Sequence, residues 1–256
     1  MSRATFRFYG ELNDLLPGGL RQASFEHRFA GRPAVKDAIE ALGVPHPEVD
    51  LIVVNGSPAP FDHRLTDGDR VAVYPASRRL DFATDARVGP APLLEPRFVL
   101  DGHLGRLAAY LRMLGFDTWY RSTADDDLLA RCSRDEDRIL LTRDRALLRR
   151  RVIVRGRFVR SDQPRRQLRE VVERFELGRA AAPFTRCLRC NTPLESVGRA
   201  DVLDRLEPLT RRFYRVFARC PACDAIFWQG SHHARMERLI ASVLGDDDRD
   251  AAGAVR

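Results

Sequence analysis

The chain has 256 residues, 44% of them hydrophobic, which is enough to bury a core and excludes global disorder. No apolar run approaches the roughly 20 residues of a membrane-spanning helix, and the N-terminus lacks the apolar core of a signal peptide, so we expect a cytoplasmic protein that does not bind membranes. The net charge is +7, and residues 143–169 hold 11 arginines against two aspartates. This basic stretch favours a polyanionic partner such as RNA, with a solvated arginine-rich face as the alternative.

Residues 1–78 are predicted to form one small domain with the element order β-β-α-β-β. Alternating or continuous apolar residues predict four strands, and helical spacing of apolar residues predicts a helix that ends at Gly43. The expected strands lie at 4–9, 21–29, 51–54 and 70–74, and the helix at 35–42. Asn55-Gly56 is a strong signal for a tight turn.

Two stretches of this domain, Val54-Asn55-Gly56 and the sequence LTDGDRVAVYP at 65–75, resemble a β-grasp, ubiquitin-like domain of the sulfur-carrier type. The resemblance implies a carrier that ends in an exposed Gly-Gly with an activated carboxylate. Here Tyr74-Pro75 runs on into Ala76-Ser77, without a Gly-Gly. This departure argues against a sulfur-transfer accessory, so we expect the domain to serve packing or to bind a protein partner.

The rest of the chain divides at two stretches rich in small residues or proline. Residues 79–96 contain three prolines and are predicted to be a linker. We expect an α/β domain over 97–182, a cysteine-bearing segment with a C-terminal helix over 183–244, and a disordered tail over 245–256.

Strands and helices alternate in the middle segment. Short apolar runs predict strands at 98–100, 116–120, 139–142 and 152–154, with the end of another at 158–159. Helical spacing lies between them, at 104–114, 128–132 and 168–175. Such alternation indicates a parallel sheet, in which ligands bind beyond the carboxyl ends of the strands.

Asp101, Asp144 and Asp162 each lie just past a predicted strand, so we expect their carboxylates to converge. Clustered carboxylates repel one another unless a cation neutralises them, and hard oxygen ligands suit Mg²⁺ or Mn²⁺. Such an ion supports hydrolysis of a phosphodiester. Each aspartate taken alone could instead cap a helix. The run 125–127 precedes a predicted helix, where one member would cap it and another would face the site.

Four of the five cysteines form two CxxC pairs, Cys187 with Cys190 and Cys220 with Cys223. This spacing predicts a tetrahedral, structural Zn²⁺ site with four thiolate ligands. The second pair is expected in the turn of a hairpin with strands at 213–217 and 225–228. A helix beginning at Ala234 follows, and the fifth cysteine, Cys132, is expected to be buried in packing.

Three stretches, FVLDGHLGRLA at 98–108, LRMLGFDT at 111–118 and RILLTRD at 138–144, resemble the PIN-like RNase family named after the C-terminal region of the mut-seven exonuclease. With the β-grasp unit and the zinc ribbon, the resemblance covers nearly the whole chain. It implies a divalent-metal-dependent ribonuclease with an acidic site at Asp101, Asp144 and Asp162, to which Asp125 or Asp126 contributes. The alternative is a non-catalytic RNA-binding adaptor whose aspartates only cap helices.

Overall fold

The computed structural model describes residues 1–75 and 86–245. Residues 79–85 of the predicted linker and 246–256 of the predicted tail lie outside the described residues. The chain forms two compact units, residues 1–94 with 125–158, and residues 95–124 with 159–256. The middle segment of the sequence therefore contributes to both units.

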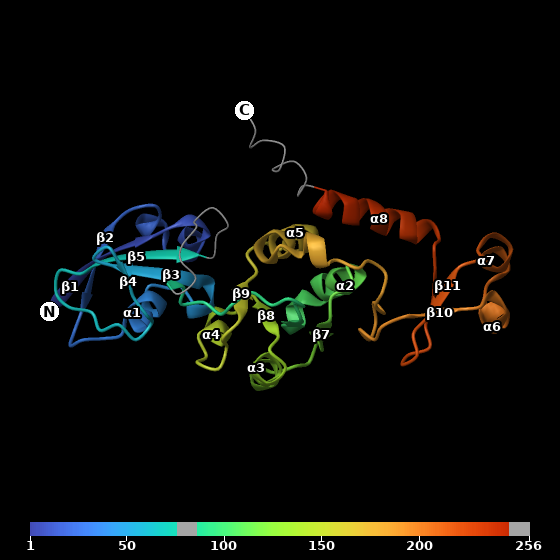
Figure 1. The fold of residues 1–256 in the computed structure, drawn as a ribbon, viewed down its shortest axis with the longest axis horizontal. Helices are drawn as coiled ribbons and strands as arrows, with labels where there is room; N and C mark the ends of the chain where they lie inside the picture. The colour runs from blue at the N-terminus through green and yellow to red at the C-terminus, as the bar shows by residue number, and fades with distance from the viewer. Residues whose placement is uncertain (76–85, 246–256) are drawn as a thin grey trace, which may run out of the picture. The chain divides into compact units, whose positions relative to one another are not determined.

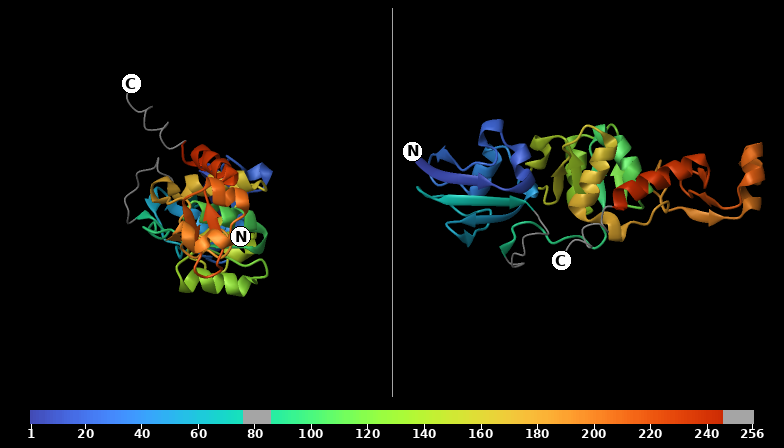
Figure 2. Two further views of the ribbon diagram at one scale, coloured as in Figure 1. Left: turned by 90° about the vertical axis from the view of Figure 1, so that its right-hand side faces the viewer. Right: turned by 90° about the horizontal axis from the view of Figure 1, so that it is seen from above.

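The first unit begins with a five-stranded sheet in the order β2-β1-β5-β3-β4 (Figure 1). Its elements are β1 (Ser2–Phe8), β2 (Phe25–Phe29), α1 (Val35–Ala41), β3 (Val49–Val54), β4 (Ser57–Pro58) and β5 (Arg70–Pro75). β1 and β5 lie side by side and pair in parallel, whereas the other neighbours pair antiparallel (Figure 2). This is a β-grasp sheet. The predicted element order is confirmed, with the two-residue strand β4 as an addition.

Local sequence accounts for the elements of this sheet. Alternate residues of β1, Ala4, Phe6 and Phe8, are buried in the core. This is the period that a strand with one covered face requires. The turn after β3 has positive φ at both Asn55 (52°) and Gly56 (90°), as a tight hairpin turn demands.

The first unit also contains α3 (Asp126–Asp135), β8 (Ile139–Thr142), α4 (Arg145–Leu148) and β9 (Gly156–Phe158). β8 is buried along its whole length and pairs in parallel with β9. The strand predicted at 152–154 is wrong. Ile153 alone of the three is buried, and its amide closes a turn by donating to the carbonyl of Arg150 at 2.9 Å. The prediction failed because one buried residue between two exposed residues is compatible with this turn as well as with a strand.

The second unit holds the other part of the α/β segment, which comprises β6 (Phe98–Leu100), α2 (Gly105–Met113), β7 (Thr118–Tyr120) and α5 (Pro164–Phe175). The C-terminal helix α8 (Ser231–Leu244) belongs to the same unit. β6 and β7 pair in parallel, and with β8 and β9 they confirm the predicted parallel α/β class. Gly115 ends α2: its φ is +93°, and a Cβ there would lie 2.1 Å from the carbonyl oxygen of Ala182.

The C-terminal ribbon is a three-stranded antiparallel sheet ordered β10-β11-β12. Its elements are β10 (Glu195–Val197), α6 (Arg199–Val202), α7 (Pro208–Phe213), β11 (Phe217–Arg219) and β12 (Ile226–Trp228). The predicted hairpin around the second CxxC pair is confirmed. Its first strand begins only at Phe217, because Pro208 starts a helix that runs to Phe213. No helix in the described ranges is long and apolar enough to cross a bilayer.

Candidate metal and nucleic-acid sites

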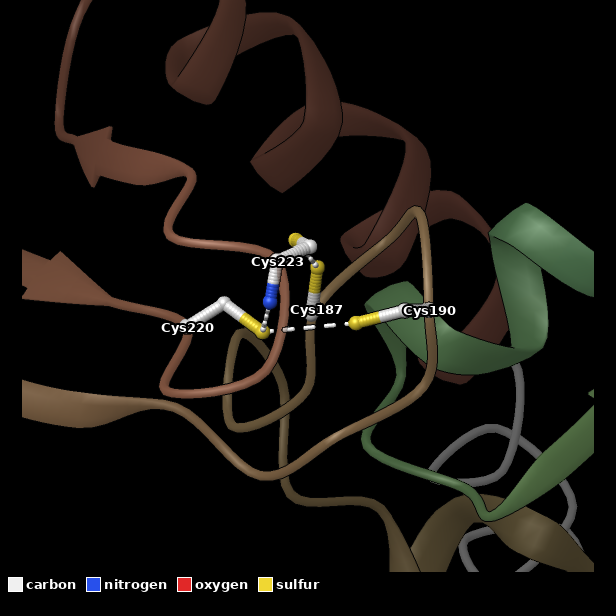
Figure 3. Close-up of side chains that lie close together, drawn as sticks. All are labelled: Cys187, Cys190, Cys220 and Cys223. Atoms are coloured by element: carbon white, nitrogen blue, oxygen red, sulfur yellow. Dashed lines mark hydrogen bonds between the residues drawn. The ribbon is translucent and has the colours of Figure 1, made fainter.

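The four paired cysteines come together in the second unit, as their spacing predicts. Their side chains turn toward one another from two loops, and their sulfur atoms all lie within 4.8 Å (Figure 3). Cys187 and Cys223 have Sγ atoms 3.5 Å apart, and those of Cys190 and Cys220 are 3.3 Å apart. Around a tetrahedral zinc ion with Zn–S bonds of about 2.3 Å, thiolate sulfurs stand about 3.8 Å apart. The group therefore has the composition and size to hold a metal ion such as zinc.

The environments of Cys187 and Cys190 differ. Cys187 is fully buried, and burial raises the pKa of its thiol to about 12. A hydrogen bond with Thr192, across 3.5 Å, is the main cause that lowers the pKa of the Cys190 thiol to about 6. Because thiolates are the form that binds metal, the lowered pKa of Cys190 favours binding, whereas burial works against loss of the proton from Cys187.

Arg112 joins the first cysteine loop to α2, and the sequence gives no sign of this role. Its buried guanidinium donates to the Thr118 carbonyl at 3.0 and 2.9 Å, and to the carbonyls of Leu188 and Arg189 at 3.2 and 2.8 Å. The loop carbonyls are those of the two residues between Cys187 and Cys190. Arg112 thus places a positive charge beside a group that would carry four thiolates.

We expect one zinc ion per chain on these four cysteines. Cys190→Ser should abolish stoichiometric zinc in metal analysis and destabilise the C-terminal ribbon, because binding of the ion contributes directly to its folding. Cys132→Ser is the matched control, since this buried cysteine lies outside the group, and it should retain zinc. A metal-free protein, or a disulfide between the pairs, would contradict the assignment.

The five candidate aspartates divide between the two units. Asp101 and Asp162 belong to the second unit, and Asp125, Asp126 and Asp144 to the first. Asp101 directly follows β6, at the N-cap of the short 3-10 helix Gly102–Leu104, but its side chain makes no capping hydrogen bond. The capping interpretation therefore does not account for Asp101.

Two other aspartates do cap helices. Asp144, two residues after β8, accepts hydrogen bonds with its Oδ1 from the amides of Ala146 (2.6 Å) and Leu147 (3.4 Å). Asp125 accepts one from the amide of Leu128 at 2.7 Å, so it is the capping member of its run. In both carboxylates the capping bonds use one oxygen, Oδ1, so the other can take a further ligand.

Asp126 and its neighbour Asp127 pair with Arg150 instead. The Arg150 hydrogen bond lowers the pKa of Asp127. Asp162 is exposed and makes no hydrogen bond or ion pair with the described part of the chain. It lies two residues before α5. Whether these five carboxylates share one site stays a prediction.

The arginine-rich stretch 143–169 serves two purposes. Some of its guanidiniums bind within the protein: Arg155 pairs with Asp137 at 2.9 Å, and Arg160 with Glu170 at 3.5 Å. Others have exposed side chains that make no hydrogen bond or ion pair with described residues. These are Arg149, Arg151, Arg165, Arg166 and Arg169. Part of the stretch is therefore a basic, solvent-exposed surface, and part of it is bound within the protein.

Arg157 is the clearest departure, because it is 1% exposed. Its guanidinium lies 2.7 Å from Glu48, which is 0% exposed, and 2.7 and 2.9 Å from the two carboxylate oxygens of Glu11. Glu48 also accepts from the amide of Phe158 at 2.6 Å. Both glutamates belong to the β-grasp domain and Arg157 to β9. Within the first unit, the β-grasp domain is thus fastened to the α/β segment by a buried ion-pair network.

These features define a class: an α/β protein with a β-grasp domain and a group of four cysteines that could hold a metal ion. The model of the Mut7-C RNAse domain matches residues 96–240, and that of the Mut7-C ubiquitin domain matches residues 1–81. The chain belongs to the Mut7-C family, a family of ribonuclease domains, here with its ubiquitin-like domain.

Two solved structures of small archaeal modifier protein 1 from Haloferax volcanii are similar to this chain at 20% identity, with a TM-score of 0.25. Each match covers 30% of this chain, and 100% or 98% of the archaeal chain. Among proteins with curated functions, none is significantly similar to this chain.

Proposed function

We propose that this protein is a divalent-metal-dependent ribonuclease that hydrolyses RNA phosphodiester bonds. Asp101, Asp144 and Asp162 would hold Mg²⁺ or Mn²⁺, with a contribution from Asp125 or Asp126. When bound, the ion would supply an activated water and neutralise charge on the scissile phosphate. The four-cysteine ribbon would hold a structural zinc ion apart from this chemistry.

The observation that carries the proposal is the position of two aspartates in the matched RNase region. Asp101 follows β6 directly, and Asp144 follows β8 after one residue, so both stand at carboxyl ends of parallel strands. That is where ligands of open α/β sheets bind. Asp101 is not used as a helix cap, and the second oxygen of Asp144 remains for another ligand. The donor set is therefore suited to a hard divalent cation.

Exposed arginines support the part of the proposal that concerns RNA binding. Arg165, Arg166 and Arg169 lie on the first turns of α5, close in sequence to Asp162. Their spacing of three and four residues places Arg166 and Arg165 on the helical face of Arg169. Guanidiniums with no intramolecular partner can pair with backbone phosphates, which position an RNA strand without reading its sequence.

The non-catalytic RNA-binding adaptor is the second candidate, and one observation favours it. Asp144 and Asp125 do cap α4 and α3, as that interpretation expects. Under it, the arginines would bind RNA in the same way, and no added metal ion would produce cleavage.

A cleavage assay separates the two candidates. Zinc-loaded protein should cleave RNA only when Mg²⁺ or Mn²⁺ is added, and excess Mg²⁺ after a short EDTA treatment should restore cleavage. Structured and unstructured RNAs should both be offered, with metal analysis after EDTA to show that the ribbon retains its zinc. Absence of cleavage under all conditions, with RNA binding intact, would favour the adaptor. Cleavage without any divalent ion would refute metal dependence.

A further inference from the structure

The C-terminal ribbon exposes large apolar side chains that lie outside its own small core. That core is made by Val202, Leu206 and Phe217, all buried, with Tyr214 packed against them. On α7, Leu209 and Phe213 are 70% and 65% exposed. Val216, three residues further on, is 65% exposed. Leu209 and Phe213 are four residues apart on α7 and so lie on the same face of the helix. An exposed apolar pair of this kind indicates a binding surface.

Arginines lie among these apolar groups in the sequence, after Glu207 at the start of α7. Residues 208–219 hold four arginines and no acidic residue. The Arg212 guanidinium lies over the Phe213 ring, 5.5 Å from its centroid. Arg215 folds back on the end of α7 and donates to the carbonyls of Arg212 and Tyr214, at 3.0 and 3.2 Å. The segment thus combines a preordered cation–aromatic pair with a further fixed cation.

A second aromatic side chain lies in the same module. Trp228, at the end of β12, is 39% exposed, and it stands opposite Phe217 in the pairing of β11 with β12. A Cβ added at Gly230 would lie 3.0 Å from the Trp228 Nε1 and 3.7 Å from the Tyr214 hydroxyl. The indole nitrogen and the Tyr214 hydroxyl therefore both lie close to Gly230, and part of the indole stays exposed.

We propose that these residues form a platform for single-stranded RNA, defined by Leu209, Arg212, Phe213, Arg215 and Val216, with Trp228 beside it. Unpaired bases would stack on Phe213 and on the Trp228 indole, and Arg212 and Arg215 would pair with phosphates. Aromatic faces combined with arginines are what proteins use for unstacked bases, whereas the bases of a duplex are already stacked and unavailable. A protein partner would have to place acidic groups opposite this surface. The inference rests on the proposed function, since it names the form of RNA that the nuclease receives.

The test measures binding of the full-length, zinc-loaded chain to a labelled single strand and to a duplex, without Mg²⁺ or Mn²⁺ so that the RNA stays intact. Phe213→Ala should weaken single-strand binding by about 5- to 150-fold, the range found for stacking one base. Duplex binding should change far less, and Phe213→Trp should retain single-strand affinity. Leu94→Ala, at an exposed apolar position outside the ribbon, is the control and should change neither.

Zinc content and melting temperature should be unchanged in Phe213→Ala, since the side chain is outside the core. The platform would be overturned if Phe213→Ala and Arg212→Ala bound single-stranded RNA as tightly as the parent. It would also be overturned if these variants lost as much affinity for duplex RNA as for single-stranded RNA. The two proposals fail separately. If the parent cleaves RNA and the variants bind it normally, only the platform is rejected. If binding depends on Phe213 but no metal ion produces cleavage, only the ribonuclease is rejected. A parent that binds no RNA overturns both.

Discussion

Asp101→Asn and Asp144→Asn should each leave a folded, zinc-loaded protein that binds RNA but cleaves it at least about 100-fold more slowly with Mn²⁺ or Mg²⁺. Loss of a group that merely supports a metal ligand costs about 10- to 100-fold, so loss of a ligand itself should cost more. The amide is neutral and no longer anchors the cation, although its carbonyl can still accept a hydrogen bond. Cleavage rate, RNA affinity and melting temperature should be measured on the same preparations.

Asp144 makes this test informative, because it demonstrably caps α4 through Oδ1. Asparagine is as good an N-cap as aspartate, so a purely capping residue would lose neither stability nor cleavage. Asp135→Asn is the matched control: it removes one exposed carboxylate at the end of α3, which pairs with its neighbour Arg134. Cleavage at the parental rate by both Asp101→Asn and Asp144→Asn would reject the acidic site and leave the adaptor.

Local patterns predicted most of the secondary structure because the signals that set it are local. The helix α1 and the turn at Asn55-Gly56 follow from spacing and from residues that tolerate positive φ. The two errors arose where a short apolar run did not follow a strand's burial pattern. Ile153 is buried inside a turn, and Phe213 ends a helix with its ring in solvent.

The candidate sites were predictable to different degrees for the same reason. The CxxC spacing encodes a metal site within a few residues, so the cysteine group was found. Arg112 contacts Leu188, 76 residues away, and Arg157 contacts Glu48, 109 residues away. Periodic sequence patterns do not predict such long-range contacts. An arginine that forms a buried ion pair cannot be told from an exposed arginine by sequence alone. The structure was needed to separate Arg157 from Arg165, Arg166 and Arg169.

Arg157→Met should lower the free energy of unfolding of the first unit by about 3–5 kcal/mol, the cost of breaking a buried ion pair by removing one partner. Glu48 would remain buried without its ion pair to Arg157, and Glu11 would lose both of its bonds to Arg157. Glu48→Gln should have an effect of similar size. Denaturant unfolding gives the free energy, and hydrogen exchange at the amides of β9 and the β-grasp helices locates the loss.

Glu26→Gln is the matched control for that experiment, since it breaks the Arg3–Glu26 pair in the same domain at 62% and 55% exposure. An exposed pair of this kind should contribute at most about 1 kcal/mol. The double variant Glu48→Gln with Arg157→Met should lose less than the sum of the single changes, because neither lone charge then stays buried. Small, additive losses would mean that the β-grasp domain is only loosely attached and free to engage another protein. A large, non-additive loss means that it is a built-in part of the ribonuclease segment, fixed to β9, the strand from which the chain continues to Asp162.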